Sequence, residues 1–287
     1  MKTGFLGLGA MGAHMARNLH RAKLLTAVWN RSTDKATTLA AELGCLAPAT
    51  PAQVAAACDV VVMCVSADVD VLAVVNQLLP GLRAGQLVID CSTVSGETAK
   101  AAAALLAPLG VDFLDCPVSG GTEGARDAAL AIMVGGSQAA FDRAQPVLTA
   151  MGRTITRFGE TGAGQAAKAT NQIMCAGIIR AVGEAMSFAK AQGLPLAQVV
   201  ETLGKGAGSS WYFVNRAPFM VNERFPPGFR VRLHQKDLRI CRDMAAACGG
   251  ALPVVDNVLA DYEKLVADGY GDEDISAIFR LTERLFD

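Results

Sequence analysis

Three glycines near the start of the chain constrain its fold more than any other feature. Gly7, Gly9 and Gly12 have the spacing GxGxxG, and they follow an apolar run that begins at Gly4. Between a strand and a helix, the first glycine forms a tight turn, the second lets phosphates approach the backbone, and the third lets the helix pack closely. The helix N-terminus attracts negative charge. The spacing therefore predicts a strand-turn-helix unit whose turn binds a phosphate group.

Short apolar runs alternate with alanine-rich segments through the first half of the chain. Continuously apolar runs are typical of parallel strands that helices cover on both faces. We therefore expect a doubly wound, Rossmann-type α/β domain with a parallel sheet. Its expected strands are residues 4–8, 25–29, 60–65, 87–90, 113–115 and 132–134.

The second half of the chain has a different pattern. Residues 163–192 contain no proline, so we expect one long helix that ends at Gly193-Leu194-Pro195. Glycine- and proline-bearing loops separate the helical patterns that follow. These further helices are expected at residues 196–203, 235–248, 253–268 and 275–285. The organisation that we expect is a Rossmann domain over residues 1–161 and an all-helical domain over residues 162–287.

The end of the second expected strand bears on the identity of the phosphate ligand. A site that prefers NAD places an acidic residue about twenty residues after the glycine turn, where it binds the ribose 2′-hydroxyl. Here the sequence is Asn30-Arg31-Ser32, so no carboxylate would repel a 2′-phosphate, and the Arg31 guanidinium can bind one. We predict NADP as the preferred cofactor and NAD as a weaker one. The alternative is that Arg31 is a solvated loop residue.

Other cofactor contacts are expected at the carboxyl ends of the strands, where open α/β sheets bind ligands. Ala10 and Met11 lie within the glycine turn, and Val65, Ser66 and Thr93 follow two later strands. Thr93 could bind the nicotinamide ribose, but threonine at such a position is equally common as a helix cap. Both roles are open for Thr93.

Two further segments have residues suited to binding a small acid. In Ser119-Gly120-Gly121, successive backbone N–H groups can form a nest that binds a carboxylate. Lys168, Asn171 and Gln172 are spaced i, i+3 and i+4, which places them on one face of the long helix. A single helical lysine is ordinarily a solvated charge, but Lys168 lies among small residues just after a glycine-rich loop.

Four sequence motifs together resemble those of the β-hydroxyacid dehydrogenases. In chain order they are GFLGLGAMG, DCPVSGG, GAGQAAKATNQ and KDL, the last of which begins a later expected helix. The family includes 3-hydroxyisobutyrate dehydrogenase, tartronate semialdehyde reductase and the succinic semialdehyde and glyoxylate reductases. The resemblance covers essentially the whole chain, and it implies hydride transfer between a nicotinamide cofactor and a small 3-hydroxy acid or its semialdehyde.

The resemblance also implies the roles of individual residues. Lys168 would be the catalytic acid and base, and Lys236 would lie near the nicotinamide. The implied substrate-binding residues are Ser119, Gly120, Gly121, Asn171, Gln172, Lys236 and Asp237. The family often has asparagine in place of Gln172, and glutamine there is more similar to tartronate semialdehyde reductase. Cys116 replaces the usual small residue of the second motif, a change that we expect to be tolerated.

The expected reaction uses Lys168 as a proton donor in reduction and as a proton acceptor in oxidation, so a pKa below the usual ~10.4 would help.

Two alternatives are open: a dinucleotide-binding scaffold without turnover, and a reductase of imines or amines. The motifs do not choose among glyoxylate and the tartronate, succinic and methylmalonate semialdehydes, because one methylene changes selectivity by only ~1–3 kcal/mol. The aromatic side chains at residues 211–213, 225 and 229 could line the substrate pocket or the core.

Composition argues against several other classes. The 26 basic and 27 acidic residues give a net charge of −1, which offers no footprint for nucleic acid. The eight cysteines form no CxxC pair, so we expect no metal site, and scattered thiols of this kind indicate a reducing, cytoplasmic compartment. The most apolar stretch, residues 54–75, is interrupted by three aspartates, which argues against a membrane span.

The expected partners are a small carboxylate-bearing substrate and further copies of the chain, as a homodimer or homotetramer.

Overall fold

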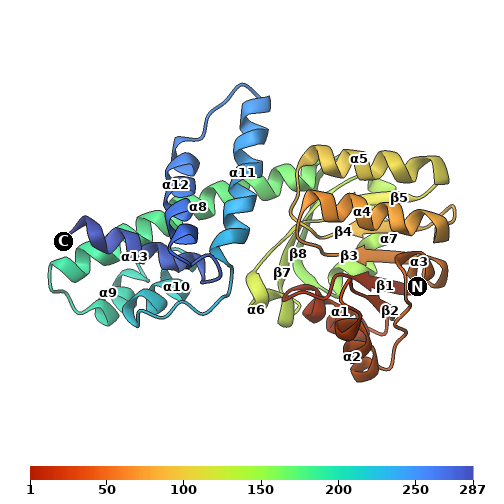
Figure 1. The fold of residues 1–287 in the computed structure, drawn as a ribbon, viewed down its shortest axis with the longest axis horizontal. Helices are drawn as coiled ribbons and strands as arrows, with labels where there is room; N and C mark the ends of the chain where they lie inside the picture. Colours follow the sequence, from red (N-terminus) through yellow and green to blue (C-terminus); the bar gives the residue numbers. More distant parts are fainter. Residues whose placement is uncertain (287) are drawn as a thin grey trace. The chain divides into compact units, whose positions relative to one another are not determined.

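The computed structural model describes residues 1–286, and the chain forms two compact units. The first unit is Met1–Lys168, and the second begins at Ala169. This division falls inside the long helix α8 (Ala163–Ala191), whereas the boundary expected from the sequence, after residue 161, precedes that helix. Figure 1 shows α8 as one continuous element.

Within residues 1–286, eight strands form one sheet in the first unit. The order across the sheet is β2 (Leu25–Trp29), β1 (Thr3–Leu6), β3 (Val60–Met63), β4 (Leu87–Asp90), β5 (Asp112–Asp115), β7 (Leu130–Gly135) and β6 (Val118–Ser119), with β8 (Gly152–Gly159) also paired to β7. Strands β1 to β5 run parallel to one another, as expected. Because the chain crosses from β2 past β1 to β3, the carboxyl end of β1 lies where α/β sheets bind ligands.

The far side of the sheet differs from the sequence expectation. Strand β7 runs antiparallel to β5 and to β6, and neither β6 nor β8 was expected. Strand β6 has only two residues, too few to show a pattern. Strand β8 exposes Arg153 and Thr154 and then alternate residues, Thr156 and Phe158, so it lacks the continuous apolar run of a buried strand.

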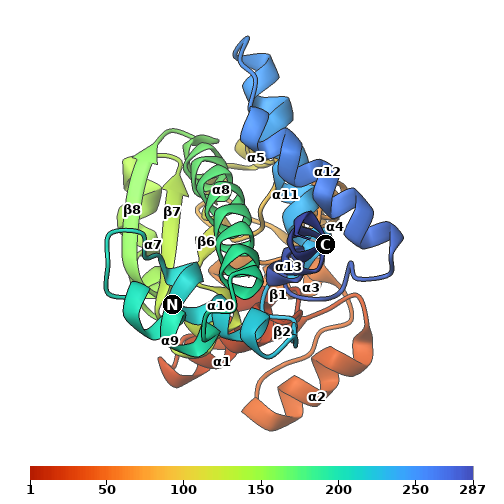
Figure 2. The same ribbon diagram turned by 90° about the vertical axis from the view of Figure 1, so that its left-hand side faces the viewer.

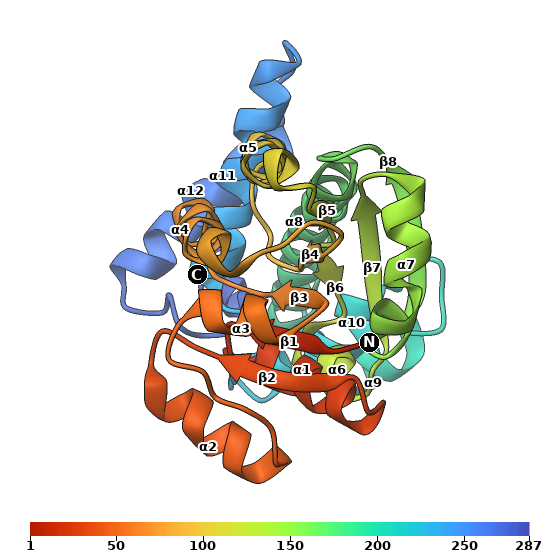
Figure 3. The same cartoon turned by 90° about the vertical axis from the view of Figure 1, so that its right-hand side faces the viewer.

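Helices cover both faces of the sheet (Figure 3). One face carries α1 (Gly12–Arg21), α2 (Thr33–Leu43), α6 (Gly121–Arg126) and α7 (Gln138–Thr149), and the other carries α3 (Pro51–Ala57), α4 (Asp68–Leu78) and α5 (Gly96–Leu106), with short 3-10 turns at η1 (Leu79–Gly81) and η2 (Ala107–Leu109). Successive strand residues enter opposite cores: Phe5 packs with α1, and Leu6 packs on the face of α3 and α4. The Rossmann-type architecture is therefore confirmed.

The described part of the second unit is helical, as expected (Figure 2). Its elements are the later part of α8, α9 (Leu196–Leu203), α10 (Trp211–Val221), α11 (Val231–Ala247), α12 (Pro253–Ala267), η3 (Ile275–Ile278), α13 (Phe279–Thr282) and η4 (Glu283–Leu285). Ile179 and Met186 of α8 pack in its core with Tyr262 of α12. None of the helices in residues 1–286 is long and apolar enough to cross a bilayer.

Three expectations for the second unit were wrong in detail. Helix α10 was missed because Pro218 lies inside it and interrupts the helical pattern. Helix α11 begins at Val231, four residues before the expected start, so Lys236 lies in its second turn instead of at its beginning. Residues 275–285 form two 3-10 turns around a four-residue helix and not one continuous helix.

Candidate active site

The geometry of the glycine turn matches the three roles that its spacing predicts. Gly7 has φ +92°, a left-handed conformation that favours glycine. A Cβ atom on Gly12 would overlap the carbonyl oxygen of Gly7, so the turn and α1 can approach this closely only without a side chain. Gly9 has open space around its Cβ position, with no atom within 4 Å. That opening is what a pyrophosphate needs to reach the backbone, so the turn fits a dinucleotide.

Asn30 holds the loop after β2 against the glycine turn. Its Oδ1 accepts a hydrogen bond from the backbone N–H of Leu8 at 2.8 Å, and its Nδ2 donates to the carbonyl of Ser32 at 3.2 Å. Arg31 lies between these anchored positions, and its side chain is 85% exposed. Its Nη1 pairs with Oδ1 of Asp70 in α4 at 3.1 Å. No sequence motif marks Asp70 as a cofactor-site residue.

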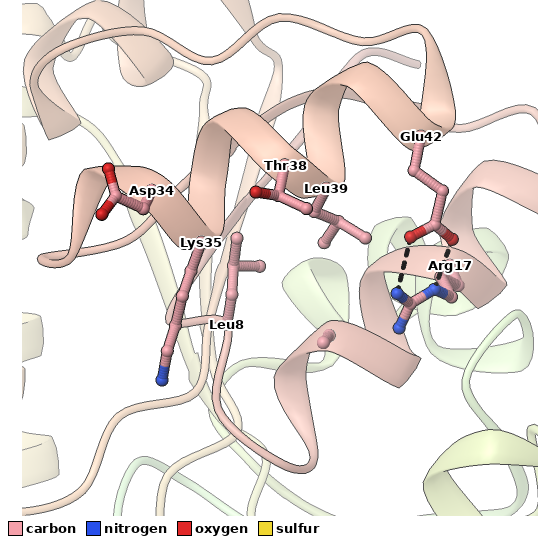
Figure 4. A pocket seen from close by; sticks show the side chains of 8 residues that line it. Leu8, Arg17, Asp34, Lys35, Thr38, Leu39 and Glu42 are labelled. Atoms are coloured by element: carbon pink, nitrogen blue, oxygen red, sulfur yellow. Dashed lines mark hydrogen bonds and ion pairs between the residues drawn. The ribbon is translucent and has the colours of Figure 1, made fainter.

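A pocket of about 310 Å³ adjoins the glycine turn, between α1 and α2 (Figure 4). Arg17 of α1 and Glu42 of α2 form a two-bonded ion pair at one end, with both distances 2.7 Å. Lys35 and Leu8 lie beside each other toward the other end. The pocket meets the turn at Leu8, and its other lining residues belong to α1 and α2, so it borders the candidate cofactor site.

The loops after β3 and β4 are tied to each other. The Ser92 hydroxyl accepts a hydrogen bond from the backbone N–H of Val65 at 2.8 Å. Helix α5 is capped by Ser95, whose hydroxyl accepts from the backbone N–H of Thr98 at 3.1 Å. Thr93 is therefore not the cap of α5, which removes the capping alternative considered from sequence. Ser66 lies exposed in the neighbouring loop.

Asp115, the acid of the DCPVSGG segment, holds the start of α8, a role that no local sequence pattern indicates. One carboxylate oxygen accepts from the backbone N–H of Gly162 at 2.8 Å, and the other accepts from that of Gln165 at 2.9 Å. Burial raises the pKa of Asp115, and these backbone hydrogen bonds partly oppose that rise. The carboxylate acts as an N-terminal cap supplied from a distant strand.

Gln165 fixes the same turn of α8 through its side chain. Its Nε2 donates to the carbonyl of Ser92 at 2.8 Å, and its Oε1 accepts from the backbone N–H of Val94 at 3.1 Å. Lys168 follows one turn later on α8 and is only 6% exposed. The candidate catalytic lysine is therefore buried on a helix whose first turn is held from two strand ends.

The Ser119 segment, predicted to bind the substrate carboxylate, forms a glycine turn. Ser119 ends β6, and Gly120 and Gly121 follow with φ values of +135° and +65°. A Cβ on Gly120 would lie 3.3 Å from the side chain of Leu130. Both glycines adopt a positive φ that other residues rarely reach, so this tight turn depends on glycine at both positions.

In the second unit, a partly buried polar network joins four of the predicted site residues. Asn171 Nδ2 donates to Gln172 Oε1 at 2.9 Å, and Gln172 Nε2 donates to Asp237 Oδ2 at 2.7 Å. The other oxygen of Asp237 pairs with Lys236 Nζ at 3.0 Å. His234, which is fully buried, contacts the Gln172 carbonyl at 3.4 Å. The structure thus brings Asn171, Gln172, Lys236 and Asp237 together.

The aromatic residues divide between core and surface. Phe213 and Phe225 are buried in the core of the second unit, while Trp211 is 52% exposed. Tyr212 lies in between: burial is the main cause that raises the pKa of its hydroxyl, and the hydroxyl hydrogen-bonds Cys175. Asn171 Nδ2 also lies 3.5 Å from the Cys175 sulfur, so Tyr212 borders the same network.

Two family models together match nearly all of the chain. Residues 2–159 match the NAD-binding domain of 6-phosphogluconate dehydrogenase, and residues 162–282 match the NAD-binding domain of NADP-dependent 3-hydroxyisobutyrate dehydrogenase. The chain is 36% identical to 2-hydroxy-3-oxopropionate reductase of Escherichia coli, over 99% of this chain and 97% of that protein. It is 33% identical to the NAD-dependent L-serine dehydrogenase of Pseudomonas aeruginosa, over 100% and 98% respectively. The structure of Mycobacterium tuberculosis 3-hydroxyisobutyrate dehydrogenase with L-serine superposes with a TM-score of 0.89, at 34% identity, covering 98% of each chain.

The glycine turn, the Rossmann-type sheet and these matches define a nicotinamide-dependent oxidoreductase of the hydroxyacid dehydrogenase class. Within that class, the chain belongs to the β-hydroxyacid dehydrogenase family. The resemblance stated from the sequence is thereby confirmed.

Proposed function

We propose that this enzyme prefers NADP(H) and interconverts a small 3-hydroxy acid and its semialdehyde, with Lys168 as the catalytic acid and base. The observation that carries the proposal is the placement of Lys168. It is 6% exposed, it stands one turn after a helix start held by Asp115 and Gln165, and Asn171 follows one turn later on the same helix. An amine held in this way is suited to proton transfer at a fixed position.

Each residue of the proposed site has its own role in the reaction. Bound nicotinamide supplies the hydride in reduction and accepts it in oxidation. The N–H groups of Ser119, Gly120 and Gly121 bind the substrate carboxylate, and Asn171 helps to orient it. The Lys168 ammonium donates its proton to the carbonyl oxygen as the hydride reaches the carbonyl carbon. In the reverse direction the neutral amine takes the hydroxyl proton, so charge and protons balance in both directions.

The preference for NADP rests on Arg31. The relatives differ in cofactor, since one matching model describes NADP-dependent enzymes and the Pseudomonas relative is NAD-dependent. In this chain the loop after β2 presents no carboxylate at Asn30 or Ser32, and the Arg31 guanidinium is largely exposed at the expected position of the ribose. A guanidinium can bind a 2′-phosphate through two parallel hydrogen bonds.

The test is the loss of NADPH absorbance with glyoxylate and with the tartronate, succinic and methylmalonate semialdehydes, repeated with NADH. Lys168→Ala is expected to lower turnover by about 10²- to 10⁴-fold while NADPH binding is retained. Near-wild-type turnover of that variant would reject the lysine assignment. A protein that binds NADPH but consumes none with any substrate would be a scaffold, and turnover of cyclic imines without a carboxylate would indicate an imine reductase.

We also propose that the chain assembles as a homodimer or homotetramer. Helix α8 exposes Met174 (61%) and Phe188 (52%), which are fourteen residues apart and so share one helix face. Large apolar side chains aligned in this way favour burial against a partner. Light scattering of the protein as it elutes from a size-exclusion column measures its molar mass and so the number of subunits. A monomer at micromolar concentration would contradict the proposal.

A further inference from the structure

One ion pair connects the two loops on either side of the glycine turn. Arg31 follows β2, and Asp70 lies in the first turn of α4, which follows β3. Strands β2 and β3 flank β1, and β1 leads into the glycine turn. The pair between Arg31 Nη1 and Asp70 Oδ1, 3.1 Å long, therefore spans the carboxyl edge of the sheet where the adenosine half of a dinucleotide binds.

Asp70 differs from its neighbouring acid in what it contacts. Asp68 accepts hydrogen bonds from the backbone N–H of Ser95 at 2.9 Å and from the hydroxyl of Thr98 at 2.7 Å, so it joins α4 to α5. Asp70 instead directs its carboxylate at Arg31, and its side chain remains 25% exposed. Exposed ion pairs contribute little to stability, so this contact can rearrange at small cost when a ligand binds.

We propose that Asp70 determines how strongly the enzyme discriminates NADP from NAD, an inference that rests on the proposed role of Arg31. The 2′-phosphate carries a charge of about −2 at neutral pH. Bound at Arg31, it lies close to the Asp70 carboxylate, which repels it and shares the same guanidinium. The 2′-hydroxyl of NAD has no charge and is little affected. Asp70 thus weakens NADP binding selectively and keeps NAD usable.

Removing the charge of Asp70 should change the affinity for NADP⁺ more than the affinity for NAD⁺. Asp70→Asn keeps the shape of the side chain and removes its charge, so NADP⁺ affinity is expected to rise about 3- to 10-fold at low salt, with NAD⁺ affinity changed less than about 2-fold. The gain shrinks in concentrated salt because the charges are screened. A purely structural role for Asp70 would change both affinities together and would not depend on salt in this way.

The experiment is isothermal titration calorimetry, which measures the affinities of the protein for NADP⁺ and for NAD⁺ at low and at high salt. The variants are Asp70→Asn, Asp70→Ala as a second neutral replacement, and Arg31→Ala. Asp59→Asn is the matched control, because Asp59 forms an exposed pair with Arg83 of nearly the same length, 3.2 Å, at the opposite end of β3. The control is expected to leave the ratio of the two affinities unchanged.

The outcomes separate the inference from the function on which it rests. A selective gain in NADP⁺ affinity for both Asp70 variants, together with a selective loss for Arg31→Ala, supports both. A loss for Arg31→Ala with no selective gain for the Asp70 variants overturns only the role of Asp70. Unchanged NADP⁺ affinity in Arg31→Ala rejects the proposed NADP preference itself.

Discussion

The carboxylate of Asp115 accepts a hydrogen bond from the backbone N–H of Gln165 at 2.9 Å, although the two residues are fifty positions apart in the chain. Asp115 ends strand β5, and Gln165 lies in the first turn of α8. The contact therefore fixes the first turn of the helix that carries Lys168 to the end of strand β5. Asp115, which transfers no proton in the proposed mechanism, thus helps to fix the helix turn that precedes the proposed proton donor.

Asp115→Ala is expected to destabilise the protein and to slow the reaction. It leaves the backbone N–H groups of Gly162 and Gln165 without their acceptor, at a cost of about 2–4 kcal/mol in the free energy of unfolding. Urea denaturation measures this cost, and turnover at saturating NADPH measures the displacement of Lys168. Asp112→Ala is the control, because Asp112 lies at the other end of the same strand in an exposed pair with Arg143 and should cost less than about 1 kcal/mol. Equal effects of the two variants would contradict the role of Asp115.

Two glycine substitutions separate the folding role of the turn from its binding role. Gly12→Ala places a methyl group against the Gly7 carbonyl, so the ligand-free protein is expected to lose about 1–3 kcal/mol of stability. Gly9→Ala meets no atom within 4 Å and should leave the ligand-free stability nearly unchanged. Its methyl group instead occupies the space proposed for the pyrophosphate. Thermal melts with and without NADPH distinguish the two, and full stabilisation of Gly9→Ala by NADPH would argue against pyrophosphate binding at this turn.

Sequence patterns predicted the elements whose signal is local. The strands at residues 25–29 and 87–90 and the helix at 196–203 have the expected bounds, because continuous apolar runs and proline or glycine stops mark their ends. Strand β8 and helix α10 were missed, since one is an exposed edge and the other contains a proline. The contacts of Asp115 and Asp70 were not predictable either, because each joins residues about forty to fifty positions apart. Such partners are known only once the strand order is known.

The stability of the protein in acid is expected to depend on Asp68. Burial by itself would raise the pKa of Asp68, but hydrogen bonds from Ser95 and Thr98 outweigh it and hold the pKa below its usual value. A carboxyl group whose pKa is lowered by folding stabilises the protein above its unfolded-state pKa of about 3.9, and this contribution is lost as the pH falls through the folded-state value.

Asp68→Asn tests this linkage. The difference in unfolding free energy between wild type and variant should be constant from neutral pH down to about pH 5 and should shrink below about pH 4. Thr98→Val removes one of the hydrogen bonds to Asp68 and should reduce the acid-dependent part of the difference. Denaturation curves at a series of pH values provide the measurement. A difference that stays constant down to pH 3 would show that Asp68 is not the group responsible.

The network in the second unit predicts that Asp237 acts on substrate binding through its neighbours. Asp237 is 4% exposed and accepts from Gln172, which in turn accepts from Asn171. Asp237→Ala leaves the buried Gln172 amide without an acceptor and Lys236 without this partner, at about 2–4 kcal/mol of stability. Asp237→Asn keeps an oxygen for Gln172 and removes only the charge opposite Lys236.

For both Asp237 variants, the KM for the carboxylate substrate is expected to rise more than kcat falls, because in the proposed mechanism Asn171 orients the substrate and Lys168 transfers the proton. The alanine variant should show the larger increase, about 10-fold or more, since losing an acceptor releases Gln172 from its position. The affinity for NADP⁺, measured by titration, should stay within about 2-fold of wild type if the network serves the substrate alone. Should Asp237→Ala lower kcat and leave KM unchanged, the network would instead act on the proton transfer step, and Asp237 would have to be reassigned from substrate positioning to the environment of Lys168.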